Sequence, residues 1–107
     1  STVNNPVLTV NRSGVISQYG TLTAAATTGA QTINKPTGSV NFAAAATSLV
    51  VTNSLVSTST PILCTIQTND LTFTSCQCVP GSGSFTIYAN SAATGETKVY
   101  FEVKAVN

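Results

Sequence analysis

The sequence predicts an all-β fold, an antiparallel β-sandwich of jelly-roll-like type that follows an extended N-terminal segment. Three observations predict it. Short stretches of alternating apolar and polar residues recur along the chain, residues typical of turns separate them, and the helix-forming stretches are too short to stand alone. Many short strands without helices bury their apolar faces as two packed antiparallel sheets.

The first two expected strands lie in the middle of the chain. Residues 39–42 form a short candidate strand, and residues 48–52 form the next. The second contains Leu49, Val50 and Val51, a run too apolar for a strand that is exposed on one face. We therefore expect residues 48–52 to be buried on both faces.

Residues 61–68 and 71–79 are expected to form a hairpin about a turn at Asn69-Asp70. One face of the first strand carries Ile62, Cys64 and Ile66. The other face carries Leu63, Thr65 and Gln67. On the return strand, Leu71, Phe73 and Val79 are expected to share one face, because they lie in phase in an alternating strand.

The last two strands follow the strongest loop signal in the chain, Pro-Gly-Ser-Gly at residues 80–83. Residues 84–90 place Phe85, Ile87 and Ala89 on one face, opposite Thr86, Tyr88 and Asn90. After a loop at residues 92–95, the final strand places Val99, Phe101, Val103 and Ala105 inward. Its outward residues are Tyr100, Glu102 and Lys104. Alanine-rich residues 24–26 and 43–46 are too short for helices and are expected to form loops or closely packed strands.

The N-terminal third differs from the rest of the chain. Residues 20–32 contain one large apolar side chain, Leu22, which is too little apolar surface to offset the entropy of ordering the segment. We expect a mobile loop, or an arm that becomes ordered against a partner. The chain thus divides into an arm or loop region at 1–31, with one or two strands, and a sandwich domain at 32–107.

Composition limits the partners of the chain. Its 107 residues fit one domain, and charged residues make up 7%, against about 25% in a typical domain. The four basic residues are scattered and the net charge is +1, so neither nucleic acid nor a membrane surface is an expected partner. A protein with so little charge has little electrostatic repulsion between its molecules and associates readily. We therefore expect this chain to be held in an assembly or joined to neighbouring domains.

The sequence contains no recognisable catalytic site, and no cofactor or metal is expected. The chain has no His, and its carboxylates are Asp70, Glu96 and Glu102. Glu96 and Glu102 lie about 20 Å apart along one strand, which is too far for paired-carboxylate hydrolysis. A pairing of Asp70 with either Glu stays open. We expect a protein that is not an enzyme.

Three cysteines form the remaining cluster of interest. In the expected hairpin Cys64 lies opposite Cys76, and Cys78 faces the same way as Cys76, so three thiols meet on one sheet face. The favoured interpretation is that they are small buried hydrophobes. A closed zinc site needs a fourth ligand from a second chain. An odd number of cysteines favours synthesis in a reducing cytoplasm, although Ser1 is compatible with either a trimmed Met or a cleaved signal peptide.

Four segments carry a resemblance to a known family. They are TINKPTGSVNFAAAATSLVVTNSLV at 32–56, IQTND at 66–70, VPGSGSFTI at 79–87 and AATGET at 92–97. Together they resemble a module of virion proteins from tailed bacteriophages, found as a small stand-alone protein and at the ends of longer ones. The resemblance implies a β-sandwich on the outside of a virus particle. The three cysteines and the N-terminal third depart from it.

The resemblance and the short chain together suggest a capsid decoration or cement protein, made in the host cytoplasm and located on the capsid surface of the virion. Such a protein binds the major capsid protein and reinforces contacts between capsomers. We expect a homo-oligomer, with a trimer favoured and a dimer as the alternative. The expected capsid contacts lie in the N-terminal segment and are Val3, Pro6, Val7, Leu8, Val10 and Leu22.

Two other functions remain open. The first alternative is a receptor-binding or tail-fibre module, whose natural contacts would be the outward-facing Tyr88 and Tyr100. The second alternative is a secreted bacterial adhesin domain. Ordinary sheet packing explains both tyrosines as well.

Overall fold

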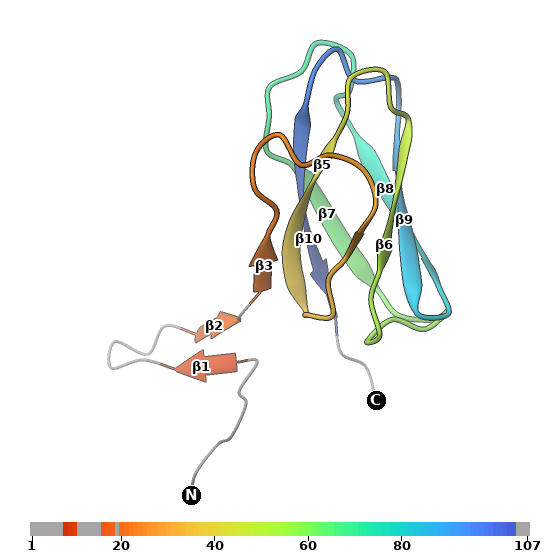
Figure 1. Ribbon diagram of the computed structural model, residues 1–107. Helices are drawn as coiled ribbons and strands as arrows, with labels where there is room; N and C mark the ends of the chain where they lie inside the picture. Colours follow the sequence, from red (N-terminus) through yellow and green to blue (C-terminus); the bar gives the residue numbers. More distant parts are fainter. Residues whose placement is uncertain (1–7, 11–15, 19, 105–107) are drawn as a thin grey trace, which may run out of the picture.

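Two four-stranded sheets pack face to face in the computed structural model, which describes residues 8–10, 16–18 and 20–104 (Figure 1). The predicted β-sandwich is confirmed. Within the described residues no segment is helical, and residues 24–26 and 43–46 lie in loops with turns. Among the same residues, no helix is long and apolar enough to cross a membrane.

Each sheet has two central strands and two outer ones. The β10 sheet runs in the order β3 (Gly20–Leu22), β5 (Thr37–Phe42), β10 (Thr97–Val103) and β7 (Ile62–Ile66). The β9 sheet runs in the order β4 (Gln31–Thr32), β6 (Ser48–Thr52), β9 (Ser84–Ala89) and β8 (Cys76–Gly81). A separate hairpin joins β1 (Leu8–Val10) to β2 (Ile16–Gln18). The long pairs are antiparallel as predicted, whereas the short strands β3 and β4 add to β5 and β6 in parallel.

The core lies between the inward faces of the two sheets. The buried apolar side chains of β9 and β10, one central strand from each sheet, are Phe85, Ile87, Val99, Phe101 and Val103. Phe85 and Phe101 meet edge to face across the core, with ring centroids 4.9 Å apart. Phe42 and Phe73 do the same at 4.8 Å. The predicted inward faces of these two strands are therefore confirmed for the described residues, which exclude Ala105.

The predicted hairpin between residues 61–68 and 71–79 is wrong. β7 pairs with β10 and β8 pairs with β9, so the two strands belong to different sheets. The connection between them crosses from one sheet to the other and buries Phe73 in the core on the way. β8 consequently begins only at Cys76. The expectation that Leu71 and Val79 share one face with Phe73 is also wrong, because Phe73 is buried whereas Leu71 and Val79 are 87% and 47% exposed.

β6 is also less buried than expected. Leu49 and Val51 face the core, but Val50 between them is 44% exposed on the outer face. The three apolar residues therefore form an ordinary one-sided strand, because no segment among the described residues covers the outer face of β6.

Residues 20–32 are held on the sandwich instead of forming the expected mobile loop or arm. After β3, the Thr23 N–H donates to the Ser39 carbonyl at 3.2 Å. The Asn41 side chain donates to the carbonyls of Ala24 and Thr27 at 2.9 and 3.0 Å. The segment, which is the orange loop in front of the sandwich in Figure 1, then crosses to the other sheet, where β4 pairs with β6. Hydrogen bonds, which the apolar content of the segment could not indicate, hold it in place.

Candidate functional site

The outer face of the β10 sheet centres on Tyr100. Tyr100 lies opposite Ser39 of β5 on one side and Thr65 of β7 on the other. Ser39 in turn lies opposite Leu22 of β3. We call this surface the Tyr100 face. Its members are Leu22, Ser39, Leu63, Thr65, Gln67, Lys98, Tyr100 and Glu102.

Tyr100 separates two shallow hollows on this face. One is lined by Leu22, Ser39, Gln67 and Lys98. The other is lined by Leu63, Cys64, Thr65 and Glu102. A leucine that is more than half exposed borders each hollow, since Leu22 is 73% and Leu63 is 56% exposed. The face therefore offers a half-buried tyrosine, a residue type that is enriched among interface hot spots, with an exposed leucine on either side of it.

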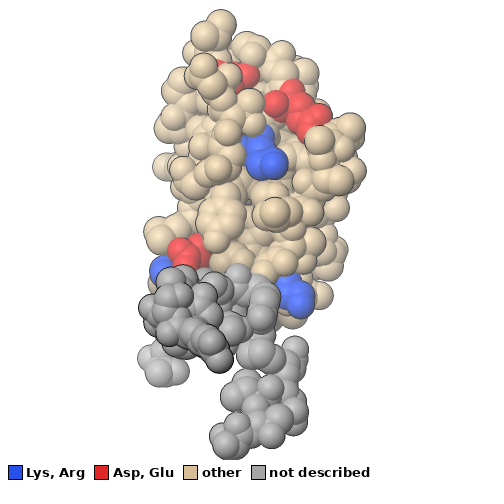
Figure 2. Space-filling view, turned by 90° about the vertical axis from the view of Figure 1, so that its left-hand side faces the viewer, with Lys and Arg blue, Asp and Glu red and all other residues tan. Residues whose placement is uncertain are grey.

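Charge on the Tyr100 face is sparse and balanced. Lys98 and Glu102 lie two residues to either side of Tyr100 on β10, and Glu102 pairs with Lys104 at 3.3 Å. Figure 2 shows that charged groups on this side of the molecule are few and are separated by uncharged surface. The exposed Glu102–Lys104 pair contributes little to stability. Because charges on the Tyr100 face are so few, binding to this face would depend on shape and apolar contact.

The outer face of the β9 sheet contains no Lys, Arg, Asp or Glu among the residues that the structure describes in its strands. Val50 of β6, Val79 of β8 and Tyr88 of β9 are 44%, 47% and 46% exposed. We call this the uncharged face. Its other members are Ser48, Thr52, Gln77 and Thr86. Because this surface consists of hydroxyl, amide and apolar groups, electrostatic repulsion does not oppose its contact with another uncharged protein surface.

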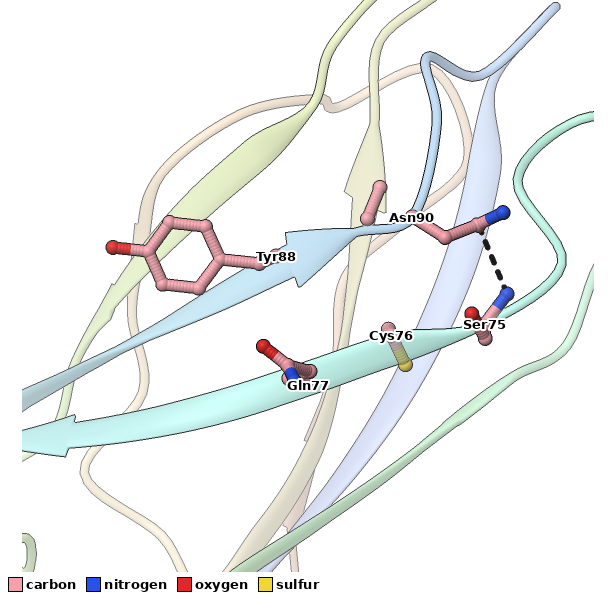
Figure 3. A pocket seen from close by; sticks show the side chains of 6 residues that line it. Ser75, Cys76, Gln77, Tyr88 and Asn90 are labelled. Atoms are coloured by element: carbon pink, nitrogen blue, oxygen red, sulfur yellow. Dashed lines mark hydrogen bonds between the residues drawn. The ribbon is translucent and has the colours of Figure 1, made fainter.

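A third hollow opens at one end of the uncharged face (Figure 3). Tyr88 and Gln77 project from adjacent strands and lie opposite each other in register. Asn90 borders the same hollow, and its Oδ1 accepts hydrogen bonds from the N–H groups of Thr74 at 2.9 Å and Ser75 at 3.0 Å. An aromatic ring at this position can stack on a sugar or a peptide, and a neighbouring amide group can donate hydrogen bonds to the same ligand.

Asp70 organises the loops at the end of the sandwich and is not available as a general base. One carboxylate oxygen accepts from the N–H and hydroxyl of Thr94 at 3.0 and 2.6 Å. The other accepts from the N–H groups of Thr72 at 3.0 Å and Phe73 at 2.8 Å. These bonds, that of the Thr94 hydroxyl foremost, hold the pKa of Asp70 well below its usual range. The carboxylate stays ionised because it is an acceptor for two loops.

The other two carboxylates also have partners of their own. Glu96 accepts a hydrogen bond from the Ala26 N–H at 2.8 Å, and Glu102 pairs with Lys104. Across the described residues, no group of three or more His, Cys, Asp or Glu side chains is arranged to hold a metal ion.

The three thiols meet as expected, but by another route. Cys64 on β7 and Cys76 on β8 are not opposite each other in one sheet; their sulfurs approach to 3.1 Å across the gap between the sheets. Hydrogen bonding with Cys78 and burial raise the pKa of Cys64. Burial raises the pKa of Cys76 to about 12. Cys64 and Cys76 are therefore protonated at neutral pH. All three cysteines are partly buried, which is consistent with packing groups.

The expected contact residues are distributed unevenly over the described part of the chain. Leu22 lies on the Tyr100 face. The backbones of Leu8 and Val10 lie in β1, opposite Gln18 and Ile16 of β2. Val3, Pro6 and Val7 lie outside the described residues. Leu63 was not among the expected contacts. The alternation of residues 61–68, which places Leu63 on the face opposite Ile62, Cys64 and Ile66, is the signal that could have identified it.

Comparison of the chain with family models, with curated proteins and with solved structures gave no match.

Proposed function

We propose that this chain is a structural virion protein that binds the outside of an assembled phage capsid and reinforces contacts between capsomers. Its partner is the major capsid protein, and its role is not catalytic. Each copy makes a contact of modest area, about 800 Å² per partner. A homo-oligomer, with a trimer favoured, bridges several capsid subunits at once and gains from their high effective concentration.

The Tyr100 face is the observation that carries the proposal. Leu22 and Leu63 flank Tyr100 with more than half of their surface exposed, and their polar neighbours are hydroxyl and amide groups together with one lysine and one glutamate. Contact with a capsid protein would bury the two leucines and complete the burial of the ring. An apolar centre inside a polar rim is the usual anatomy of a protein–protein interface. The phage-like sequence pattern from residue 32 onward supports the same role.

A copy-number measurement on purified particles tests the role itself. Quantitative mass spectrometry is expected to find this chain in hundreds of copies per particle, comparable to the number of capsomer contacts. A few copies per particle would contradict coverage of the capsid.

A binding experiment tests the face. Purified chain is added to capsids that lack it, and occupancy is measured after sedimentation. Leu63→Asp is expected to reduce occupancy at least tenfold, because a charge would be buried at the centre of the contact. Leu71→Asp is the matched control, since Leu71 is an exposed leucine outside the Tyr100 face. Equal occupancy by the two variants would contradict the assignment of the face.

The receptor-binding alternative is favoured by a different observation, the hollow beside Tyr88 (Figure 3). A glycan ring stacked on Tyr88 would lie within reach of the Gln77 amide. Tyr88→Ala would then reduce adsorption of particles to cells and leave capsid occupancy unchanged. Unchanged adsorption by Tyr88→Ala particles would count against this alternative.

A further inference from the structure

The three cysteines close one side of the sandwich. β7 ends the β10 sheet and β8 ends the β9 sheet on the same side. Stacked sheets normally lie about 10 Å apart, yet Cα atoms of β7 and β8 approach within 8 Å of each other. Cys64 and Cys76 face each other across this narrowed gap, with their sulfurs 3.1 Å apart.

The geometry points to a covalent modification site: Cys64 and Cys76 form a disulfide between the two sheets by exchange with a small-molecule disulfide such as oxidised glutathione. A disulfide bond is about 2.05 Å long, so the two sulfurs need to approach by only about 1 Å. Side-chain rotation within the narrowed gap can provide this movement.

The exchange proceeds in two steps that balance. The thiolate of one cysteine attacks a sulfur of the small disulfide, which forms a mixed disulfide and releases one small thiolate. The thiolate of the second cysteine then attacks the protein sulfur of the mixed disulfide, which forms the Cys64–Cys76 bond and releases the second small thiolate. The two protons lost by the cysteines go to the two released thiolates. The protein is oxidised by two electrons and the small disulfide is reduced.

Cys64 is the member that every bridge must contain. Cys76 and Cys78 lie two residues apart on β8, where side chains project side by side in the same direction, a poor geometry for a bond between them. Cys64 is the one thiol on the opposite sheet. Its sulfur also contacts Cys78, but the 3.1 Å approach to the Cys76 sulfur assigns the bridge to Cys64 and Cys76 and leaves Cys78 as the single free thiol.

The reduced form persists in a reducing compartment. Burial keeps the pKa of Cys76 near 12, and the pKa of Cys64 is raised as well. The thiolate is the attacking species, so exchange at neutral pH is slow and accelerates as the pH rises. Both cysteines are partly exposed, which allows a small disulfide to reach them. The bond would form after the protein leaves a reducing cytoplasm.

Thiol titration of the folded chain tests the pairing. Protein purified with reductant and then incubated with oxidised glutathione in mildly alkaline buffer is expected to fall from three free thiols to one. Its mass should fall by two hydrogens, with no glutathione attached. Its melting temperature should rise by roughly 10 °C or more, because the bridge restricts the unfolded chain. Three free thiols after incubation would overturn the proposal.

Serine variants establish which cysteines pair. Cys78→Ser is expected to form the bridge, and chymotryptic cleavage after Leu71 or Phe73 should leave two peptides joined until reductant is added. Cys64→Ser is the matched control and is expected to keep both remaining thiols. Formation of a bridge by Cys76→Ser as fast as by Cys78→Ser would overturn the assignment to Cys76. The pairing depends only on the contact between β7 and β8, so its failure would leave the proposed virion role untouched.

Discussion

The two sides of the sandwich are closed by different chemistry. On the side of β5 and β6, which we call the asparagine edge, residues 20–32 cover the strands and are bound by amide hydrogen bonds. On the side of β7 and β8, which we call the cysteine edge, the sheets approach each other and three thiols fill the gap. One edge depends on directional hydrogen bonds. The other depends on packing that changes with the redox state.

The difference shows how a chain in which only 7% of the residues are charged can cover the two open sides of a sandwich. Asn41 and Asn53 are 1% and 0% exposed. Asn41 binds two carbonyls of the covering segment, and Asn53 donates to the Lys35 carbonyl at 2.9 Å and accepts from the Leu55 N–H at 2.9 Å. Buried amides of this kind are stable only because their hydrogen bonds are satisfied. The asparagine edge should therefore tolerate substitution worse than the cysteine edge does in its reduced form.

Replacement of Asn41 should produce the largest effect. Asn41→Ala removes the donors to Ala24 and Thr27 and leaves a void under the covering segment. We expect the free energy of unfolding to fall by about 3 kcal/mol, measured by urea denaturation. Asn69→Ala is the control, because Asn69 is exposed in a loop. A loss equal to that of the control would show that the covering segment is held by something other than Asn41.

Gly38→Ala should have the next largest effect, because Gly38 allows β3 to approach β5. An added Cβ would lie 2.7 Å from the Thr21 carbonyl oxygen and 2.9 Å from the ring of Phe101. Crowding of this kind should cost about 2 kcal/mol and loosen β3. Gly95→Ala is the matched control for the added methyl group, because nothing lies within 4 Å of a Cβ at Gly95. Hydrogen exchange at Thr23 should accelerate in Gly38→Ala and stay unchanged in Gly95→Ala.

Sequence periodicity predicted the strands of this fold better than it predicted how they assemble. Alternation fixed the inward faces of β9 and β10, because one side of a half-buried strand must be apolar. It did not distinguish a hairpin at Asn69-Asp70 from a crossover between sheets. The reason is that Asp70 binds Thr94, 24 residues away, and a local turn signal contains no information about such a partner.

The candidate site was predictable to a similar depth. Alternation placed Tyr100 on an outward face and Leu63 on the face opposite Cys64, but the grouping of both with Leu22 depends on the parallel pairing of β3 with β5. The entropy argument for residues 20–32 counted apolar area alone and therefore missed the amide donors of Asn41, which is distant in sequence. Hydrogen bonds between distant residues are the part of the fold that composition and periodicity do not predict.

Cys64→Ala should have a smaller effect than either edge variant above when the protein is kept reduced. The thiol is only half-buried and makes polar contact with another sulfur, so its loss should cost about 1 kcal/mol. Urea denaturation with excess reductant measures this value. A loss as large as that of Asn41→Ala would remove the contrast between the two edges.

Acid should expose the smallest contribution, that of Asp70 in the connection between the two strands of the cysteine edge. Its pKa in the folded protein lies below the unfolded value of about 3.9. The hydrogen bonds of the carboxylate therefore stabilise the fold fully above about pH 4, and this stabilisation is lost as the pH falls toward the folded-state pKa. Asp70→Asn should melt at a lower temperature than the natural chain at pH 7, and the gap should narrow below about pH 4.

The same melting series on Glu96→Gln provides the control for this pH dependence. An amide oxygen can still accept the single hydrogen bond from the Ala26 N–H, whereas Asn at position 70 has one acceptor oxygen in place of two. The gap between Glu96→Gln and the natural chain should stay small throughout. A gap for Asp70→Asn that is constant with pH would mean that Asp70 stabilises the loops through its shape and not through its charge. The cysteine edge would then depend on packing alone until it is oxidised.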